Sequence, residues 1–217
     1  MNYSNETFII SKNLGSNTKL YRYLSLSCFL EFVETKTTYL SNLNAWEDIW
    51  ELPAKHKMPI EFSNNLYGQC WSLEGISDAL WKIYAKGKEG ILIQSSVNKF
   101  LSIKQIDAAM LSPVIYYDNL ERALQKLDTL KGPEKTFYHG LLKRKAFQHE
   151  KEVRLITYVK PDKIDSIPKS ISITLNPFDF IENIFIDPRA SKWYVKTIQS
   201  YCSHVGFSIT PQQSDLL

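Results

Sequence analysis

The chain has 217 residues, of which 44% are hydrophobic and 13% aromatic, and its formal net charge is +3. This composition can build a sizeable core and excludes a disordered chain. The net charge is too small to indicate nucleic-acid binding by itself. We expect one domain with an N-terminal arm (residues 1–18), a core (19–210) and a C-terminal tail (211–217).

The sequence shows neither a membrane span nor a secretion signal. No apolar run approaches the roughly 20 residues that cross a bilayer, and the first residues lack the basic start and apolar centre of a signal peptide. The three cysteines, Cys28, Cys70 and Cys202, are too scattered for a disulfide framework. We predict a reduced, cytoplasmic protein without a membrane partner, in which Cys28 and Cys70 pack among apolar neighbours.

The first half of the chain predicts strands that alternate with helices. Behind Ser25, a residue type that caps helices, the apolar residues Leu26, Phe29, Leu30 and Val33 recur at helical spacing. The expected strands are 19–24, 37–41, 66–72 and 90–95, the expected helices are 25–36 and 76–87, and 42–53 is an acidic, aromatic loop.

The second half continues this mixture. The expected helices are 119–132, 134–147 and 191–206, and the expected extended segments are 110–117, 153–159, 170–175, 183–188 and 207–210. Neighbouring strands mixed with crossovers argue against a regular doubly wound fold. We therefore predict an α+β domain with a mixed, split β-sheet flanked by helices.

Several common active-site motifs are missing from the sequence. No glycine-rich loop opens a helix, so neither the P-loop nor the Rossmann fingerprint is present. Ser72 has no GxSxG context. The four histidines lack HxxxH spacing and no CxxC pair occurs, so we expect no zinc site.

The segment FQHEKEVRLITYV, residues 147–159, begins a buried strand with a run of charges. In an extended strand, Glu150, Glu152 and Arg154 share one face. They form either a surface ion pair, which contributes only fractions of a kcal/mol, or the border of a pocket. The preceding basic run, Lys143–Lys145, is either the solvated end of a helix or a rim that faces phosphate.

Arg22 raises a similar question on the first predicted strand. It shares a face with Leu20 and Leu24, so its guanidinium needs an anionic partner. That partner is either a carboxylate of this chain, such as Asp48 or Glu152, or the phosphate or ribose of a ligand.

Four segments together resemble the bacterial family known as domain of unknown function 2971. They are LYRYLS (20–25), NLNAWEDIWE (42–51), CWSLEGISDALWKIYAKGKEGILI (70–93) and FQHEKEVRLI (147–156). The last segment carries the Glu–x–Glu–Val–Arg strand of the family, and the second departs from it with Ile49 in place of proline. The family label implies no established reaction.

The order of these residues is also similar, more loosely, to that of ADP-ribosyltransferases. This resemblance implies NAD as the cofactor, with Glu152 opposing the positive charge that develops on the ribose and Glu150 orienting or deprotonating the acceptor. Asp48 and Glu51 would close over the substrate, or cap a turn. The implied cofactor-binding residues are Arg22, Tyr23, Ser72, Trp81, Tyr84 and Arg154. For Trp81 core packing remains open, as does a strand-end role for Ser72.

Three functions remain open. A metal-dependent nuclease would gather Mg²⁺ at Asp48, Glu51, Glu150 and Glu152, whereas a non-catalytic sensor or partner-binding domain would use these charges only as internal pairs. ADP-ribosyl transfer is the favoured function, with a protein or a nucleic acid as acceptor. It predicts that Arg22 and Glu152 line one cleft. A role as a toxin or anti-phage effector is a hypothesis drawn from the family likeness.

Overall fold

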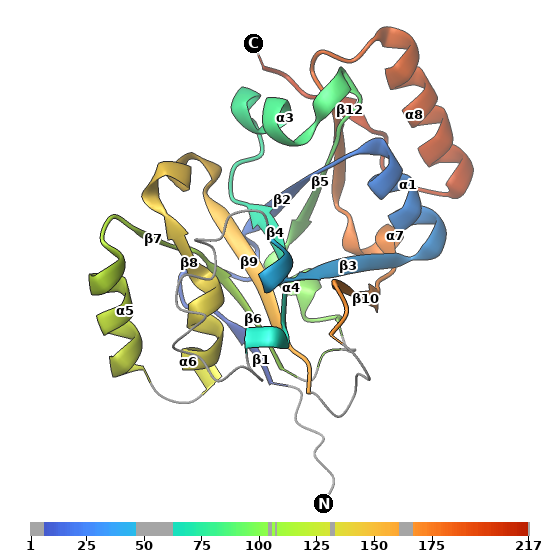
Figure 1. Cartoon of the computed structure of the whole chain (residues 1–217). Coiled ribbons are helices and arrows are strands. Elements are labelled where there is room, and N and C mark those ends of the chain that lie inside the picture. Colours follow the sequence, from blue (N-terminus) through green and yellow to red (C-terminus); the bar gives the residue numbers. More distant parts are fainter. Residues whose placement is uncertain are drawn as a thin grey trace, which may run out of the picture. The chain divides into compact units, whose positions relative to one another are not determined.

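The computed structural model describes residues 7–46, 63–103, 106, 108–130, 133–160 and 167–216. The chain divides into two compact units, each assembled from segments that are far apart in sequence (Figure 1). Unit 1 comprises Met1–Leu14, Tyr39–Cys70 and Ile103–Ile173, and unit 2 comprises Gly15–Thr38, Trp71–Ser102 and Thr174–Leu217. None of the described helices has the length and hydropathy that a bilayer span requires.

Unit 1 is built on strands of mixed direction. They are β1 (Thr7–Ile10), β3 (Thr37–Asn42), β4 (Leu66–Ser72), β6 (Ala108–Pro113), β7 (Ile115–Tyr117), β8 (Leu142–Arg144), β9 (Glu152–Tyr158) and β10 (Ser170–Thr174), of which β3, β4 and β10 each extend by one or two residues into unit 2. The strand order is β1-β6-β9-β4, and β3 pairs with both β4 and β10. β1 is parallel to β6, β6 is antiparallel to β9, and β7 and β8 form a separate parallel pair.

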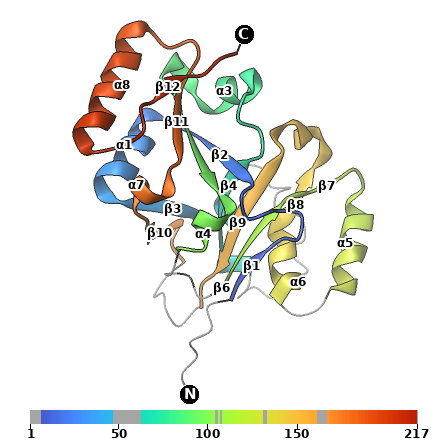
Figure 2. The same cartoon turned by 180° about the vertical axis from the view of Figure 1, so that it is seen from behind.

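Helices and short turns pack on these strands. They are α5 (Leu120–Thr129), α6 (Pro133–Tyr138) and the 3-10 turns η1 (Leu43–Ala45), η5 (His139–Leu141) and η6 (Lys145–Glu150). α5 lies beside α6 in Figures 1 and 2, where Leu124 and Leu127 share an apolar cluster with Tyr138. A second cluster, which includes Phe137 of α6 and Ile156 of β9, connects α6 to the sheet.

Unit 2 contains β2 (Lys19–Leu24), β5 (Ile91–Ser96), β11 (Asn183–Ile186) and β12 (Gln212–Gln213). Neighbouring strands are antiparallel from β2 to β5 and from β5 to β11, and β12 is parallel to β11. Ser72, the last residue of β4, pairs with Tyr21 of β2. β5 is buried along its whole length, as its continuous apolar run predicted.

The helical segments of unit 2 are α1 (Leu26–Thr35), α3 (Asp78–Tyr84), η4 (Lys86–Lys88), α4 (Val97–Phe100), α7 (Pro177–Phe180) and α8 (Lys192–Val205). Two of these helices, α1 and α8, match the expected ranges to within one residue at each end, whereas the expected helix over 76–87 is shorter and α4 and α7 were not expected. The Ser25 hydroxyl accepts from the Cys28 amide at 3.2 Å, and α8 ends at Gly206 in the left-handed conformation with φ of 97°. α1 and α8 lie side by side in both views, and the Tyr201 hydroxyl donates to Glu34.

The α+β class and the mixed sheet are confirmed. Three element predictions are wrong. Residues 7–10 of the expected arm form β1, because this β-rich run pairs with β6. The expected helix over 134–147 ends at Tyr138, and Leu142–Arg144 pair with β7 instead. Residues 207–210 form no strand, since Phe207 packs against Phe29 and Phe178, and the chain pairs with β11 only at Gln212–Gln213.

Candidate functional site

Four charged side chains are gathered at the start of β9 in unit 1. Lys143, Glu150, Glu152 and Arg154 are exposed by only 5%, 7%, 3% and 0% of their surfaces. Because ionised groups are rarely buried unless they are paired, this charged cluster is the feature of unit 1 that most needs an explanation.

β9 itself and the separate β7–β8 pair bring these side chains together. Glu152 and Arg154 lie two residues apart on β9, so they share a face of the strand. β7 and β8 run in parallel with Tyr116 opposite Lys143. The Tyr116 hydroxyl oxygen accepts from the backbone N–H of Glu152 at 2.9 Å, which ties β7 to the first residue of β9.

A turn between η6 and β9 delivers the second carboxylate. Glu150 is the last residue of η6 and Lys151 follows in the left-handed conformation, with φ of 43°. This conformation disfavours a residue with a Cβ atom and costs about 1 kcal/mol. It reverses the chain between the two glutamates, and both carboxylates reach the ammonium of Lys143 as a result.

The ion pairs form a connected chain. Lys143 Nζ lies 2.6 Å from Glu150 Oε2 and also donates to Glu152 Oε2. Arg154 Nε donates to Glu152 Oε1 at 2.7 Å, and its Nη1 donates to the Gly140 carbonyl at 2.6 Å. Each oxygen of Glu152 therefore accepts from a different cation, which fixes the orientation of the carboxylate.

An aromatic ring and two glycines pack against this charged cluster. The Arg154 guanidinium lies over the Trp46 ring at 4.5 Å from its centroid, a cation–π arrangement. A Cβ atom on Gly68 would lie 3.0 Å from that ring, and one on Gly140 would lie 2.6 Å from Leu43. Gly68 thus leaves room for Trp46, and Gly140, whose carbonyl binds Arg154, leaves room for Leu43 and Ile156.

Glu152 is ionised despite its burial. Burial raises the pKa of this carboxyl, but the charges of Arg154 and Lys143, with hydrogen bonds from Arg154 and from the Cys70 thiol, outweigh it and lower the pKa. The same surroundings act on Tyr116. Its pKa is raised by burial and by the neighbouring carboxylates, against the hydrogen bond from the Glu152 amide and the charge of Lys143.

Three expectations about this region are corrected by the structure. The Glu152–Arg154 pair forms, but it is buried and not at the surface. Lys143 is neither at a solvated helix end nor on an exposed rim, since it belongs to β8 and is 5% exposed. Cys70 is exposed, unlike a packing residue, and so is Cys28 of unit 2.

Sequence reasoning missed four contributors, Lys143, Tyr116, Trp46 and Cys70. Their positions depend on the parallel pairing of β7 with β8 and on the neighbouring places of β4 and β9 in the strand order. The one local signal was the basic run Lys143–Lys145 behind two leucines, and this run alone does not distinguish a buried cation from a solvated one.

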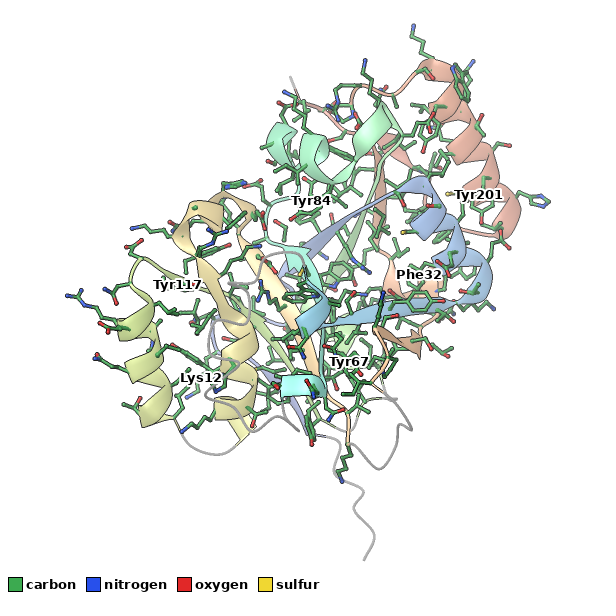
Figure 3. The ribbon with its side chains drawn as sticks, viewed as in Figure 1. Lys12, Phe32, Tyr67, Tyr84, Tyr117 and Tyr201 are labelled. Atoms are coloured by element: carbon green, nitrogen blue, oxygen red, sulfur yellow. The ribbon has the colours of Figure 1, made fainter. Side chains whose placement is uncertain are left out.

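The residues predicted to bind the cofactor in unit 2 gather around α3 and β2. Arg22 is half-buried and donates from Nη1 to Thr38 Oγ1 at 3.2 Å. The Tyr23 ring lies edge-on to Trp81 at 4.9 Å and stacks with Tyr84 at 6.3 Å between centroids (Tyr84 is labelled in Figure 3). Tyr84 as a whole residue is 46% exposed, so part of its surface is open to a ligand.

Other residues of the predicted set have local roles. Trp81 is completely buried with Ala85 and Leu92, which favours the packing role that the sequence left open. The Ser72 hydroxyl accepts from the Glu74 amide at 2.8 Å, as a residue at a strand end often does. The Tyr23 hydroxyl donates to the Gly75 carbonyl, and burial raises its pKa.

Two predictions about the site stay predictions. Asp48 and Glu51 lie outside the described residues. Arg22 belongs to unit 2 and Glu152 to unit 1, and their pairing stays a prediction.

Metal coordination finds little support in the residues that the structure describes. They contain no group of three His, Cys, Asp or Glu side chains that could hold an ion. Glu150 and Glu152 do converge, but the Lys143 ammonium lies between them, where a bridging metal would need to bind.

This chain was compared with solved structures and with curated protein sequences. Solved structures similar to this chain include DarT of Thermus sp. 2.9 in complex with NAD+, at 12% identity and a TM-score of 0.45, over 93% of this chain and 97% of the other. They also include its complex with ADP-ribosylated ssDNA, at 11% identity and a TM-score of 0.45, over 94% and 96% of the two chains. No curated protein matches the sequence.

The family comparison concerns the stretch from within α3 to the first half of β9. The sequence model of the family described as "Protein of unknown function (DUF2971)" matches residues 80–155. Trp81, Tyr84 and the Glu150–Arg154 motif lie within it. The resemblance of this chain to the DUF2971 family is thereby confirmed.

Proposed function

We propose that this protein transfers ADP-ribose from NAD, and that Glu152 is the carboxylate that acts on the ribose. The observation that carries the proposal is the state of Glu152, an ionised carboxylate oriented by two cations and touched by an exposed thiol. A fixed anion stabilises positive charge more effectively than a mobile one, because it needs no reorganisation during the reaction.

The chemistry requires such a group. Cleavage of the bond between nicotinamide and ribose leaves the electron pair on nicotinamide and develops positive charge on the ribose, as in glycoside hydrolysis. Glu152 opposes that charge in this proposal. Glu150 shares the Lys143 ammonium with Glu152 and takes the proton that the acceptor loses when its new bond to the ribose forms.

Unit 2 contains residues that fit the parts of NAD. The Arg22 guanidinium suits phosphate and ribose oxygens, and the exposed face of Tyr84 suits a flat ring. Trp81 is buried and supports Tyr84 through Tyr23. Substitutions in unit 2 therefore test the binding of NAD, whereas substitutions of Glu152 test the reaction.

A non-catalytic binding domain is the second candidate function. The charged cluster contains two cations and two anions, so its formal charges balance without any ligand. A role in specifying the fold is enough to explain a network of buried charges that balance one another, without any ligand. The two candidates differ in whether Glu152 is needed for chemistry or only for stability.

The decisive experiment uses a charge-balanced variant. Glu152→Gln alone leaves two buried cations with one anion, so its loss of activity could reflect unfolding. In Lys143→Met/Glu152→Gln one cation and one anion are removed together, and Glu150 and Arg154 remain. The matched control is Lys145→Met/Asp118→Asn, which removes an exposed ion pair of the same unit.

Release of labelled nicotinamide from NAD is measured for each folded variant, with protein and single-stranded DNA as acceptors. We expect the Lys143→Met/Glu152→Gln variant to lose at least about 100-fold in rate, the usual effect of removing one electrostatic group from an active site. The control should keep the wild-type rate. A folded double variant with undiminished rate would exclude Glu152 from catalysis, and a wild-type protein without turnover would favour the binding domain.

A toxic role is tested in cells. If ADP-ribosyl transfer is directed against an essential acceptor, expression of the wild-type chain should slow growth, and the Lys143→Met/Glu152→Gln variant should relieve it. Equal growth inhibition by both chains at equal expression would contradict an enzymatic toxin or anti-phage effector.

A further inference from the structure

Among the described residues, two of the four side chains that contact Glu152 are open to solvent. Lys143 and Arg154 are buried, whereas Cys70 is exposed and Tyr116 is partly exposed. Of these four partners, Cys70 and Tyr116 are therefore the two that a ligand from solvent can meet first.

The position of Cys70 in its strand is unusual. Every other residue of β4 is buried, and Cys70 alone in that strand is exposed. Gly68, two residues earlier on the same face, is covered by Trp46, and Ser72, two residues later, is buried, so Cys70 is the open position on this face. The thiol thus faces both solvent and the Glu152 carboxylate.

The three donors to Glu152 differ greatly in strength. Arg154 and Lys143 donate as cations, one to each oxygen, and such charge-assisted bonds are strong. The Cys70 thiol also donates to this carboxylate, but an S–H group is a weak donor. Displacing the thiol therefore costs little, and the two cations would keep the carboxylate oriented.

We propose that Cys70 holds the place of a ligand hydroxyl on Glu152, and that Tyr116 borders the same approach. This inference rests on the proposed function, in which the hydroxyl belongs to the ribose of NAD. Cys70 is not a catalytic residue in this proposal, because it leaves the carboxylate when the ligand binds. A hydroxyl donates more strongly than a thiol, which favours the exchange.

The chain offers a matched control for Cys70. Cys28 is also exposed, but it lies in unit 2 on α1, and Cys202 is buried, where burial raises the pKa of its thiol to about 12. Cys28→Ser therefore leaves Cys70 as the reactive thiol, and Cys70→Ser leaves Cys28.

The first arm measures alkylation by iodoacetamide with and without NAD, followed by mass spectrometry. We expect NAD to slow alkylation of Cys70 at least threefold in the Cys28→Ser protein. Alkylation of Cys28 in the Cys70→Ser protein should not change. Adenosine diphosphate, which lacks the ribose next to nicotinamide, serves as a second probe and should leave the alkylation of Cys70 unchanged. Equal slowing by adenosine diphosphate would contradict the placement of that ribose on Glu152.

The second arm compares Cys70→Ser with Cys70→Ala in the turnover of NAD. A serine hydroxyl competes with the ligand for Glu152, so KM should rise about fivefold, the factor that one ordinary hydrogen bond represents. Alanine makes no such bond, so its KM should be at or below the wild-type value. A merely structural role would instead make alanine the worse replacement, because it loses the hydrogen bond that serine keeps.

The outcomes separate this inference from the proposed function. Turnover of NAD without protection of Cys70, or with a higher KM for alanine than for serine, overturns the role of Cys70 and leaves ADP-ribosyl transfer standing. Protection without turnover supports the role of Cys70 in a binding domain and overturns the enzyme. If neither turnover nor protection occurs, both proposals fail.

Discussion

The charged cluster of unit 1 and the aromatic cluster of unit 2 are stabilised by different forces. In unit 1, Glu152 is fixed by directional bonds from Arg154 and Lys143. The negative charge of Glu152 and the positive charges of these two residues neutralise one another. In unit 2, Trp81 and Tyr23 meet edge to face in a packed apolar cluster. Charges with fixed partners can orient a reactive group, whereas stacked rings offer a surface that accepts flat ligands.

This difference suggests how the two units respond to change. Loss of one partner in unit 1 leaves a buried charge without compensation, and loss of volume in unit 2 leaves a cavity or a clash. This contrast would be wrong if removing a charge partner in unit 1 had little effect on stability, or if a change of packing volume in unit 2 had little effect.

The largest effect is expected for Arg154→Met. It leaves Glu152 buried with Lys143, which Glu150 also shares, and it removes the guanidinium stacked on Trp46. We expect a loss of about 3–5 kcal/mol in the free energy of unfolding, measured with urea. The control, Lys145→Met, breaks an exposed pair and should cost less than about 1 kcal/mol. Equal losses would mean that burial does not strengthen the unit 1 pairs.

Glycine substitutions give the next largest effect, and here unit 2 should be the more sensitive. A Cβ atom on Gly90 would lie 2.1 Å from Ala85 Cβ, an atom fixed to its backbone. On Gly140 it would meet the ends of Leu43 and Ile156, which can rotate away. We expect Gly90→Ala to cost about 3 kcal/mol and Gly140→Ala about 1 kcal/mol, by thermal unfolding. The reverse order would contradict the packing described for unit 2.

The pH dependence of stability should differ between two carboxylates. The pKa of Glu152 is lowered below its usual 4.5, so the unfolded chain binds the proton first as the pH falls. Its contribution is complete above about pH 5 and is lost as the pH falls through the folded value. The pKa of Glu182 in unit 2 is lowered as well, against some burial, by hydrogen bonds from Lys19 and Ser96.

Glu182 is 23% exposed, so solvent screens its pairing with Lys19. Urea unfolding between pH 6 and pH 3 should therefore show a shallower decline in the Lys143→Met/Glu152→Gln variant than in wild type, and a smaller change in Glu182→Gln. A larger change in Glu182→Gln would contradict the assignment of the acid-sensitive group to unit 1.

The sequence predicted the fold best where one element decides its own structure. The serine cap and apolar period of α1 and the glycine that ends α8 are local signals, and both helices form as expected. Prediction failed at Leu142–Arg144, where pairing with β7 overrides a helical pattern. No local signal reports that pairing, because β7 lies more than twenty residues earlier in the chain.

The candidate site was predictable in part for the same reason. The alternation of a strand places Glu152 and Arg154 on one face, and this required only their spacing. Lys143 reaches them from another strand and Cys70 from a third, so both required the sheet order. The left-handed Lys151 also went unforeseen, since lysine gives no signal for that conformation.

The smallest effect on stability is expected for Tyr84→Ala. The residue is 46% exposed and its ring stacks only loosely on Tyr23, so removal of the ring should cost less than about 1 kcal/mol. If the ring stacks on NAD, the dissociation constant, measured by titration calorimetry, should rise about 2- to 10-fold, the range for one aromatic contact. The neighbour Ile83 is 45% exposed on the same helix, so Ile83→Ala removes similar apolar surface without a flat ring. Weaker binding in both variants would indicate general loss of apolar surface, and unchanged binding in Tyr84→Ala would remove the aromatic cluster from ligand binding.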